Sequence, residues 1–117
     1  MSIITIDDFK KVEIRAGKIL TAEKIPDTDK LLRLTVDFAE KDAAGTLAPR
    51  QIVSGIASYF PDPQTLIGTT CMFVTNLEPR VIRGQESNGM LLAVSDDAGN
   101  FSILEPNPSI APGTLAK

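Results

Sequence analysis

The segment from residue 76 to residue 92, NLEPRVIRGQESNGMLL, brings together side chains that suit a phosphate-bearing ligand. Arg80 and Arg83 can each make two parallel hydrogen bonds to a phosphate, and the amides and hydroxyl of the segment can bond sugar hydroxyls and base edges. Gly89 lets the backbone approach a ligand closely, and Met90 is flexible enough to pack against an unstacked base. These residues predict a polar contact loop that leads into an apolar strand.

Basic residues near the first three expected strands form a second candidate surface. Arg33 points outward if Leu32 and Leu34 point into the core, because side chains alternate along a strand. We expect Lys18 to lie beside Arg33 on the neighbouring strand. The alternative is an ordinary solvated face, since lysine and arginine are mostly exposed in any protein. The members of this second group are Lys18, Lys30, Arg33 and, at the start of the third expected strand, Arg50.

The composition excludes most catalytic chemistry. The chain has no histidine and a single cysteine, Cys71, so it can form no Ser-His-Asp triad, Cys-His pair, internal disulfide or Cys/His zinc site. Two aspartate pairs, at 27 and 29 and at 96 and 97, fall in expected turns, where aspartate bonds its own backbone. We therefore expect a binding protein that is not an enzyme and that holds no metal or cofactor. The net charge of −3 argues against strong, non-specific binding to nucleic acid.

Short, mostly β elements must position these candidates. Leu32, Leu34, Val36 and Phe38 alternate with polar residues, which is typical of a strand with one buried face. Gly17 lies inside an earlier alternating run, where a glycine often marks a bulge or a sharp bend. The other expected elements are a helix over 6–11 capped by Thr5, strands from residue 12 and over 50–56, 70–75, 90–94 and 101–104, a helical turn within 62–68, turns over 25–29 and 96–100, a polar loop over 41–49, and a proline-rich tail.

Five or six short strands with little helix, the first of them long and bent at a glycine, indicate a small β-barrel of the OB type. We predict an all-β, five-stranded OB-fold barrel with short helices and a C-terminal extension, in one domain over residues 1–117. We expect Met1 to be the initiating residue of a whole gene product. Because there is no apolar run of membrane-spanning length and no signal-peptide pattern, we expect a cytoplasmic protein without a membrane partner.

The runs 70–75 and 90–94 are apolar on successive residues, as expected for strands buried on both faces. In a small barrel only one face of a strand fills the core, so the other face of these two strands would be exposed and apolar. We predict that a second copy of the chain covers this face in a two-fold homodimer. The alternative is that the proline-rich tail folds back over the same face.

The ordered segments DFKKVEIRAGKIL, AEKIPDTDKLLRLTVD, RQIVSGI and NLEPRVIRGQESNGMLLAVSD, with the closing Pro112-Gly113, resemble the tRNA-binding domain family. That family includes C-terminal domains of methionyl-tRNA synthetases and small free-standing tRNA-binding proteins. Two features depart from the family pattern, namely a longer loop over 41–49 and an acidic net charge. The resemblance implies an OB-fold and nominates as tRNA-binding residues Asn76, Arg80, Arg83, Ser87 and Met90. A purely structural role is the alternative for Asn76, Met90 and the two arginines.

The resemblance implies a non-catalytic module for protein biosynthesis that recognises the shape and backbone of folded tRNA. Such a module acts alone or as a beta subunit or C-terminal-type domain that assists methionyl-tRNA synthetase, so an aminoacyl-tRNA synthetase is a second expected partner. OB-folds commonly hold nucleic acid over strands 2 and 3, where no outward aromatic pair is evident, and this favours shape over single-strand sequence. The alternative is a relative of secretion chaperones that binds unfolded client peptides in a dimer cleft.

Overall fold

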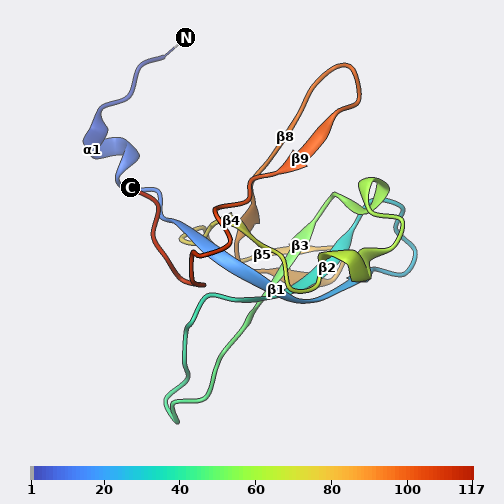
Figure 1. Ribbon diagram of the computed structural model, residues 1–117, viewed down its shortest axis with the longest axis horizontal. Helices are drawn as coiled ribbons and strands as arrows, with labels where there is room; N and C mark the ends of the chain where they lie inside the picture. The colour runs from blue at the N-terminus through green and yellow to red at the C-terminus, as the bar shows by residue number, and fades with distance from the viewer. Residues whose placement is uncertain (1) are drawn as a thin grey trace.

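In the computed structural model, which describes residues 2–117, strand β1 (Ile14–Lys24) is the spine of the fold (Figure 1). Its first half pairs antiparallel with β4 (Thr70–Val74), and its second half pairs with β2 (Leu32–Asp37). The sheet continues to β3 (Arg50–Ser54) and β7 (Met90–Leu91) in the order β3-β2-β1-β4-β7. These five antiparallel strands curl into a nearly closed barrel, which confirms the predicted all-β, OB-type architecture.

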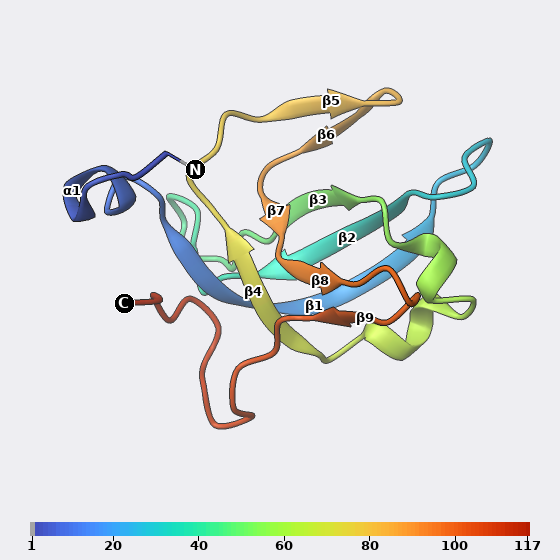
Figure 2. The same ribbon diagram turned by 90° about the horizontal axis from the view of Figure 1, so that it is seen from above.

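Two β-hairpins are separate from the barrel sheet, and one of them, the β5–β6 hairpin, stands apart from it in Figure 2. The first joins β5 (Arg80–Ile82) to β6 (Gln85–Ser87), and the second joins β8 (Ala93–Ser95) to β9 (Phe101–Ile103). The chain just after β6 closes the barrel against β3, because the Asn88 amide donates to the Gln51 carbonyl over 2.8 Å. The first hairpin therefore begins and ends at the seam of the barrel.

The barrel interior is filled by the alternating side chains that the sequence predicted for the second strand. Leu32, Leu34 and Val36 are fully buried, while the residues between them are half-buried. Phe38 follows them into the core and meets Phe73 of β4 edge to face, with 5.3 Å between ring centroids. Each buried side chain of this size contributes about 1.5–3 kcal/mol through removal of apolar area from water. The same alternation turns Arg33 to the outer face.

Gly17 is required by packing and does not mark a bulge. A Cβ atom at this position would lie 2.5 Å from the Phe38 ring and 2.6 Å from Val36, so no side chain fits. The register of β1 against β2 shifts between Ile19 and Thr21, which places the irregularity three residues further along the strand. The expected bend is present, but its position and the role of the glycine differ from the sequence-based expectation.

The N-terminal segment lies outside the barrel, and Met1 falls outside the described residues. Helix α1 (Ile6–Phe9) begins as predicted, since the Thr5 hydroxyl accepts a hydrogen bond from the Asp8 amide over 3.1 Å. It ends two residues earlier than expected. The reason is that the carboxamide of Asn76 holds the backbone of Lys11 and Glu13, which keeps the chain out of a further helical turn.

The expected strand over 90–94 is divided, and its prediction as a segment buried on both faces is wrong. Strand β7 contains only two residues, with Leu91 buried and Met90 half-exposed. After Leu92 the chain leaves the barrel, so β8 lies in a projecting hairpin and all three of its residues are exposed (Figure 1). On the neighbouring β4 the residues alternate between half-buried and buried as far as Phe73. The expected apolar face over these two strands is therefore smaller than predicted.

The proline-rich tail folds back, but onto the edge of β1. The Gly113 amide donates to the Ala16 carbonyl over 2.7 Å, and the Ala116 amide donates to the Ile14 carbonyl over 2.8 Å. Gly113 has a φ of 88°, and a Cβ there would lie 2.5 Å from the Phe38 carbonyl oxygen, so only glycine fits. The tail thus continues the sheet where β2 ends.

The connecting segments follow the sequence-based expectation more closely. Asp62 caps a single 3₁₀ turn, η2 (Pro63–Leu66), and a second turn, η1 (Ala57–Tyr59), follows β3. Asp27 adopts a positive φ of 62° in the expected turn before β2. The loop over 41–49 projects from the barrel as a long excursion (Figure 1). None of the helices in the described part of the chain has the length and apolar character to span a membrane.

Candidate RNA-binding surface

The tip of the β5–β6 hairpin has an unusual backbone conformation. Arg83 and Gly84 form a two-residue connection with φ values of 52° and 78°. Two positive φ values in succession define the type I′ turn that matches the twist of a hairpin. A residue with a Cβ seldom adopts this conformation, and such positions are often functional. The turn places the Arg83 side chain at the exposed end of the hairpin.

Three contacts fasten this hairpin to the barrel. The Gln51 side-chain amide donates to the Glu86 carbonyl over 2.9 Å, and an Arg33 guanidinium N–H donates to the Gln85 side chain over 3.2 Å. At its base the Ser87 hydroxyl accepts from the Val53 amide over 3.0 Å. Side chains of β2 and β3 therefore orient a segment that pairs with neither strand in the sheet.

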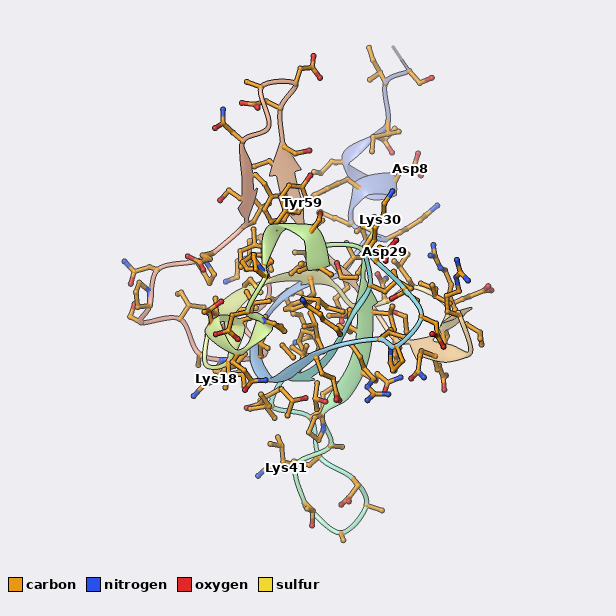
Figure 3. The ribbon with its side chains drawn as sticks, turned by 90° about the vertical axis from the view of Figure 1, so that its right-hand side faces the viewer. Asp8, Lys18, Asp29, Lys30, Lys41 and Tyr59 are labelled. Atoms are coloured by element: carbon orange, nitrogen blue, oxygen red, sulfur yellow. The ribbon has the colours of Figure 1, made fainter. Side chains whose placement is uncertain are left out.

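Three basic side chains lie on this hairpin or line a hollow beside it, and they make no ion pair within residues 2–117. Arg80, Arg83 and Lys30 are all exposed. Lys30 and Arg83 line one hollow, together with Asp27 and Asp29, and Figure 3 shows Lys30 next to Asp29 on this side of the barrel. A guanidinium or ammonium without an internal partner is available for a phosphate.

Arg80 lies at the rim of an adjoining groove with an apolar floor. The groove has a volume of about 330 Å³ and shares Leu31 and Ile82 with the hollow beside Lys30. Met90 lines it and is 47% exposed, so its side chain is a surface residue and not a core residue. The remaining lining residues include Val53, Ser54, Gly55, Leu77, Glu78 and Leu91. The sequence reasoning missed Leu31, Leu77 and Ile82, although apolar residues inside a polar loop were a detectable signal.

Asn76 and Ser87 use their side chains to hold the backbone. Asn76 accepts from the Glu13 amide over 2.8 Å and donates to the Lys11 carbonyl over 2.6 Å. Ser87 is 4% exposed and donates to the Gly89 carbonyl while it accepts from Val53. These bonds support the structural alternative for Asn76 and give Ser87 a structural role as well. Direct tRNA contacts by either residue stay predictions.

The Arg50 side chain is largely buried, and its guanidinium is bound by other groups of the protein. Its guanidinium makes a two-pronged ion pair with Glu40, at 2.7 and 2.8 Å, and donates to the Thr75 carbonyl. It lies 5.4 Å from the centroid of the Phe38 ring, and its side chain is 17% exposed. The hydrogen bonds from Arg50 lower the pKa of the Glu40 carboxyl. Arg50 is thus built into the barrel end, and a tRNA contact by it stays a prediction.

Lys18 and Arg33 are not neighbours, which corrects the expected second surface. Antiparallel pairing places Lys18 opposite Asp37 and Arg33 opposite Glu23. Arg33 makes a 2.8 Å ion pair with Glu23 in addition to its bond to the hairpin. Figure 3 shows Lys18 well apart from Lys30. The expectation was wrong because strands that run in opposite directions carry the two basic positions towards opposite ends.

A second set of charges lies at the end of the barrel where the tail pairs with β1. Arg15 bonds the Glu13 carboxylate over 2.8 Å, and the Thr75 hydroxyl donates to the same carboxylate over 2.7 Å. These two hydrogen bonds lower the pKa of the Glu13 carboxyl, and the bond from Arg15 has the larger effect. The sequence reasoning missed this set because one partner, Thr75, lies far away in the sequence.

Cys71 has the core position that the sequence predicted. Burial raises the pKa of its thiol to about 12, which makes the thiol unreactive.

Comparison with known proteins identifies relatives of the whole chain. The family model described as "Putative tRNA binding domain" matches residues 14–115. Methionine–tRNA ligases from Methanoregula boonei and Xylella fastidiosa are 47% and 43% identical over 112 and 110 residues, which is 96% and 94% of this chain. The chain spans about 15% of the length of these relatives.

Two solved structures share the fold over essentially their full length. A methionyl-tRNA synthetase related protein from Pyrococcus horikoshii aligns with a TM-score of 0.86 and 33% identity, covering 100% of both chains. Chaperone CsaA from Bacillus anthracis aligns with a TM-score of 0.80 and 27% identity, covering 99% of this chain and 100% of that one. With its match from residue 14 to residue 115, the chain belongs to the tRNA-binding domain family, a family of non-catalytic binding modules.

Proposed function

We propose that this chain binds folded tRNA by shape and backbone, through the surface formed by the β5–β6 hairpin and the turn before β2. The observation that carries the proposal is that Arg80, and Lys30 with Arg83, line two adjoining hollows that share Leu31 and Ile82, on a protein of net charge −3. Phosphate contacts supply most of the affinity in such complexes and fix orientation without reading sequence.

The absence of aromatic side chains from β1, β2 and β3 supports backbone recognition. Proteins that bind single strands stack successive bases on exposed aromatic rings. In the described residues of β1, β2 and β3 there is no aromatic side chain, and Phe38, which follows β2, is buried against Phe73. Because Arg80, Arg83 and Lys30 make no ion pair in the described residues, we expect about two or three neutralised phosphates, a shallow salt dependence and micromolar affinity (roughly 10⁻⁴–10⁻⁶ M).

A module of this kind would assist an aminoacyl-tRNA synthetase by tethering. Its relatives include segments of methionine–tRNA ligases, so a methionyl-tRNA synthetase is the partner that we propose, with the chain acting either alone or as an appended domain. Raising the local tRNA concentration increases the overall affinity without any new contact at the catalytic site. We place this activity in the cytoplasm and in a single domain over residues 1–117.

We further propose that two copies of the chain associate through the N-terminal segment. This segment carries four large apolar side chains that are at least 47% exposed, namely Ile3, Ile4, Ile6 and Phe9. Helix α1 contains no buried residue. Exposed apolar side chains that gather on one segment are normally covered by a partner. A two-fold pair would present two tRNA surfaces. Light scattering at micromolar concentration tests this arrangement, and a monomer mass for the wild type would exclude it.

The test of the proposed function compares three ligands at two salt concentrations. The ligands are folded tRNA, unstructured RNA of equal length and an unfolded peptide. We expect tRNA to bind best, with a modest loss of affinity at the higher salt concentration. Equal affinity for folded and unstructured RNA would contradict the proposal.

A peptide-binding function is the second candidate. It is favoured by the apolar floor of the groove beside Arg80 and by the structural likeness to chaperone CsaA. Preferential binding of the unfolded peptide in the same experiment, with little dependence on salt, would establish this candidate in place of the first.

A further inference from the structure

The groove beside Arg80 has the character of a pocket for one flat, partly apolar group. Its apolar lining includes Leu77 and Ile82, from the segment before β5 and from β5 itself, and Val53 and Met90, from β3 and β7. Ligand sites of this kind are mostly apolar with a few well-placed polar groups. Here the polar groups are the Ser54 hydroxyl and the Glu78 carboxylate.

The charges around the groove alternate with its apolar floor. Arg80 lies at its rim, and Arg83 with Lys30 lines the next hollow, beyond the shared residues Leu31 and Ile82. A nucleic-acid strand has the same order, because each base is flanked by a phosphate on either side. Asp27 and Asp29 also line the hollow of Lys30 and Arg83, but phosphates can bond the three cations directly, whereas an apolar peptide carries no group of opposite charge. The surroundings therefore favour RNA.

We propose that the groove receives one unpaired base of the bound RNA, with the flanking phosphates on Arg80 and on the Lys30–Arg83 pair. This inference rests on the proposed function and names the feature of tRNA that its site recognises. Glu78 and Ser54 offer acceptor oxygens, so a base with an exocyclic amino group, such as adenine or cytosine, fits better than uracil. An unpaired base costs the least to extrude from a stack.

Gly55 provides a way to fill the groove without disturbing the fold. It lines the groove, has no positive φ, and a Cβ atom placed on it meets no atom within 4 Å. Gly55→Leu therefore narrows the space while it leaves every charge in place. Ala98→Leu, in the exposed turn of the β8–β9 hairpin, is a matched control with a similar added side chain.

The probe is an RNA hairpin with a single bulged adenine, compared with the same hairpin lacking the bulge. Labelling the bulge with 2-aminopurine reports the surroundings of the base by fluorescence. We expect the wild type and Ala98→Leu to prefer the bulged hairpin by about tenfold, the factor that one specific hydrogen-bonded base contact provides. Gly55→Leu should lose this preference and the fluorescence change, and replacement of the adenine by uracil should weaken both.

The outcomes separate this inference from the function on which it rests. If folded tRNA binds better than unstructured RNA but Gly55→Leu binds the bulged hairpin like the wild type, the groove inference is wrong and the proposed function stands. If an unfolded peptide expels the 2-aminopurine base from the wild-type groove, the groove is a peptide site and the inference is overturned. If folded tRNA does not bind preferentially, both fail.

Discussion

Two pairs of arginines lie on this barrel in opposite circumstances. Arg15 and Arg50 are tied to Glu13 and Glu40 and to backbone carbonyls, whereas Arg80 and Arg83 are exposed and make no ion pair in the described chain. The residue type is the same in both places. The difference teaches that an arginine is available to a ligand only where the fold leaves its donors unused, and the following predictions test this contrast.

The largest effect is expected for Arg50→Ala. Removal of this largely buried guanidinium leaves the Glu40 carboxylate and the Thr75 carbonyl without their donor and should lower the free energy of unfolding by about 2 kcal/mol. Urea denaturation measures the loss, and Arg80→Ala is the matched control. Equal stability of the two variants would remove the distinction between the two pairs.

The opposite effect is expected at the hairpin. The double variant Arg80→Ala, Arg83→Ala should weaken tRNA binding by about tenfold or more, since each charged contact to phosphate is worth about 1 kcal/mol. Its thermal unfolding should match that of the wild type, because neither side chain has a partner in residues 2–117. Fluorescence anisotropy with labelled tRNA measures the affinity. Unchanged binding with a large loss of stability would show these arginines to be structural.

Asn76 extends the contrast to a neutral side chain. Asn76→Ala should cost about 1 kcal/mol of stability because two backbone groups lose their hydrogen bonds. Asn76→Asp keeps the acceptor for the Glu13 amide and should recover part of the loss. Affinity for tRNA, measured on folded protein, should change less than in the arginine double variant. The reverse ranking would mean that Asn76 contacts the RNA.

The smallest effect concerns pH. The pKa values of Glu13 and Glu40 are lowered in the folded protein by hydrogen bonds from Arg15 and Arg50. As pH falls, these carboxylates therefore take up protons in the unfolded chain before they do so in the folded protein. The stability that their ionised form provides is present above the ordinary pKa of 4.5 and is lost as pH falls through the lowered folded pKa values. Urea titrations between neutral and acid pH should show a shallower loss in Glu40→Gln. An identical pH profile would contradict this account.

The sequence was sufficient for features that depend on nearby residues. The alternation over 32–38 predicts β2 because burial on one face of a strand is a local pattern, and Thr5 predicts the helix start because its hydroxyl bonds an amide three residues away. The ordered family segments predict the barrel as a whole. These signals act over distances along the chain that a sequence displays directly.

The remaining features depend on contacts between distant residues. Gly17 is explained by Phe38, and Asn76 by Lys11 and Glu13, so neither role is visible along the chain. The sequence alone does not distinguish an asparagine that hydrogen-bonds the protein backbone from one that hydrogen-bonds a ligand. The groove was hidden for a similar reason, since Leu31 and Leu77 meet only when the hairpin docks beside β3.

The way in which the β5–β6 hairpin is docked has a consequence for protein engineering. Its orientation comes from Arg33 and Gln51, which belong to the barrel, and from Ser87, which bonds the backbone of β3. A graft of residues 77–87 alone onto another small barrel would carry the two arginines but would not reproduce the orientation of the hairpin that presents them. A successful transplant must also bring the donor side chains of β2 and β3, so the unit that can be exchanged between scaffolds is a hairpin together with its docking site.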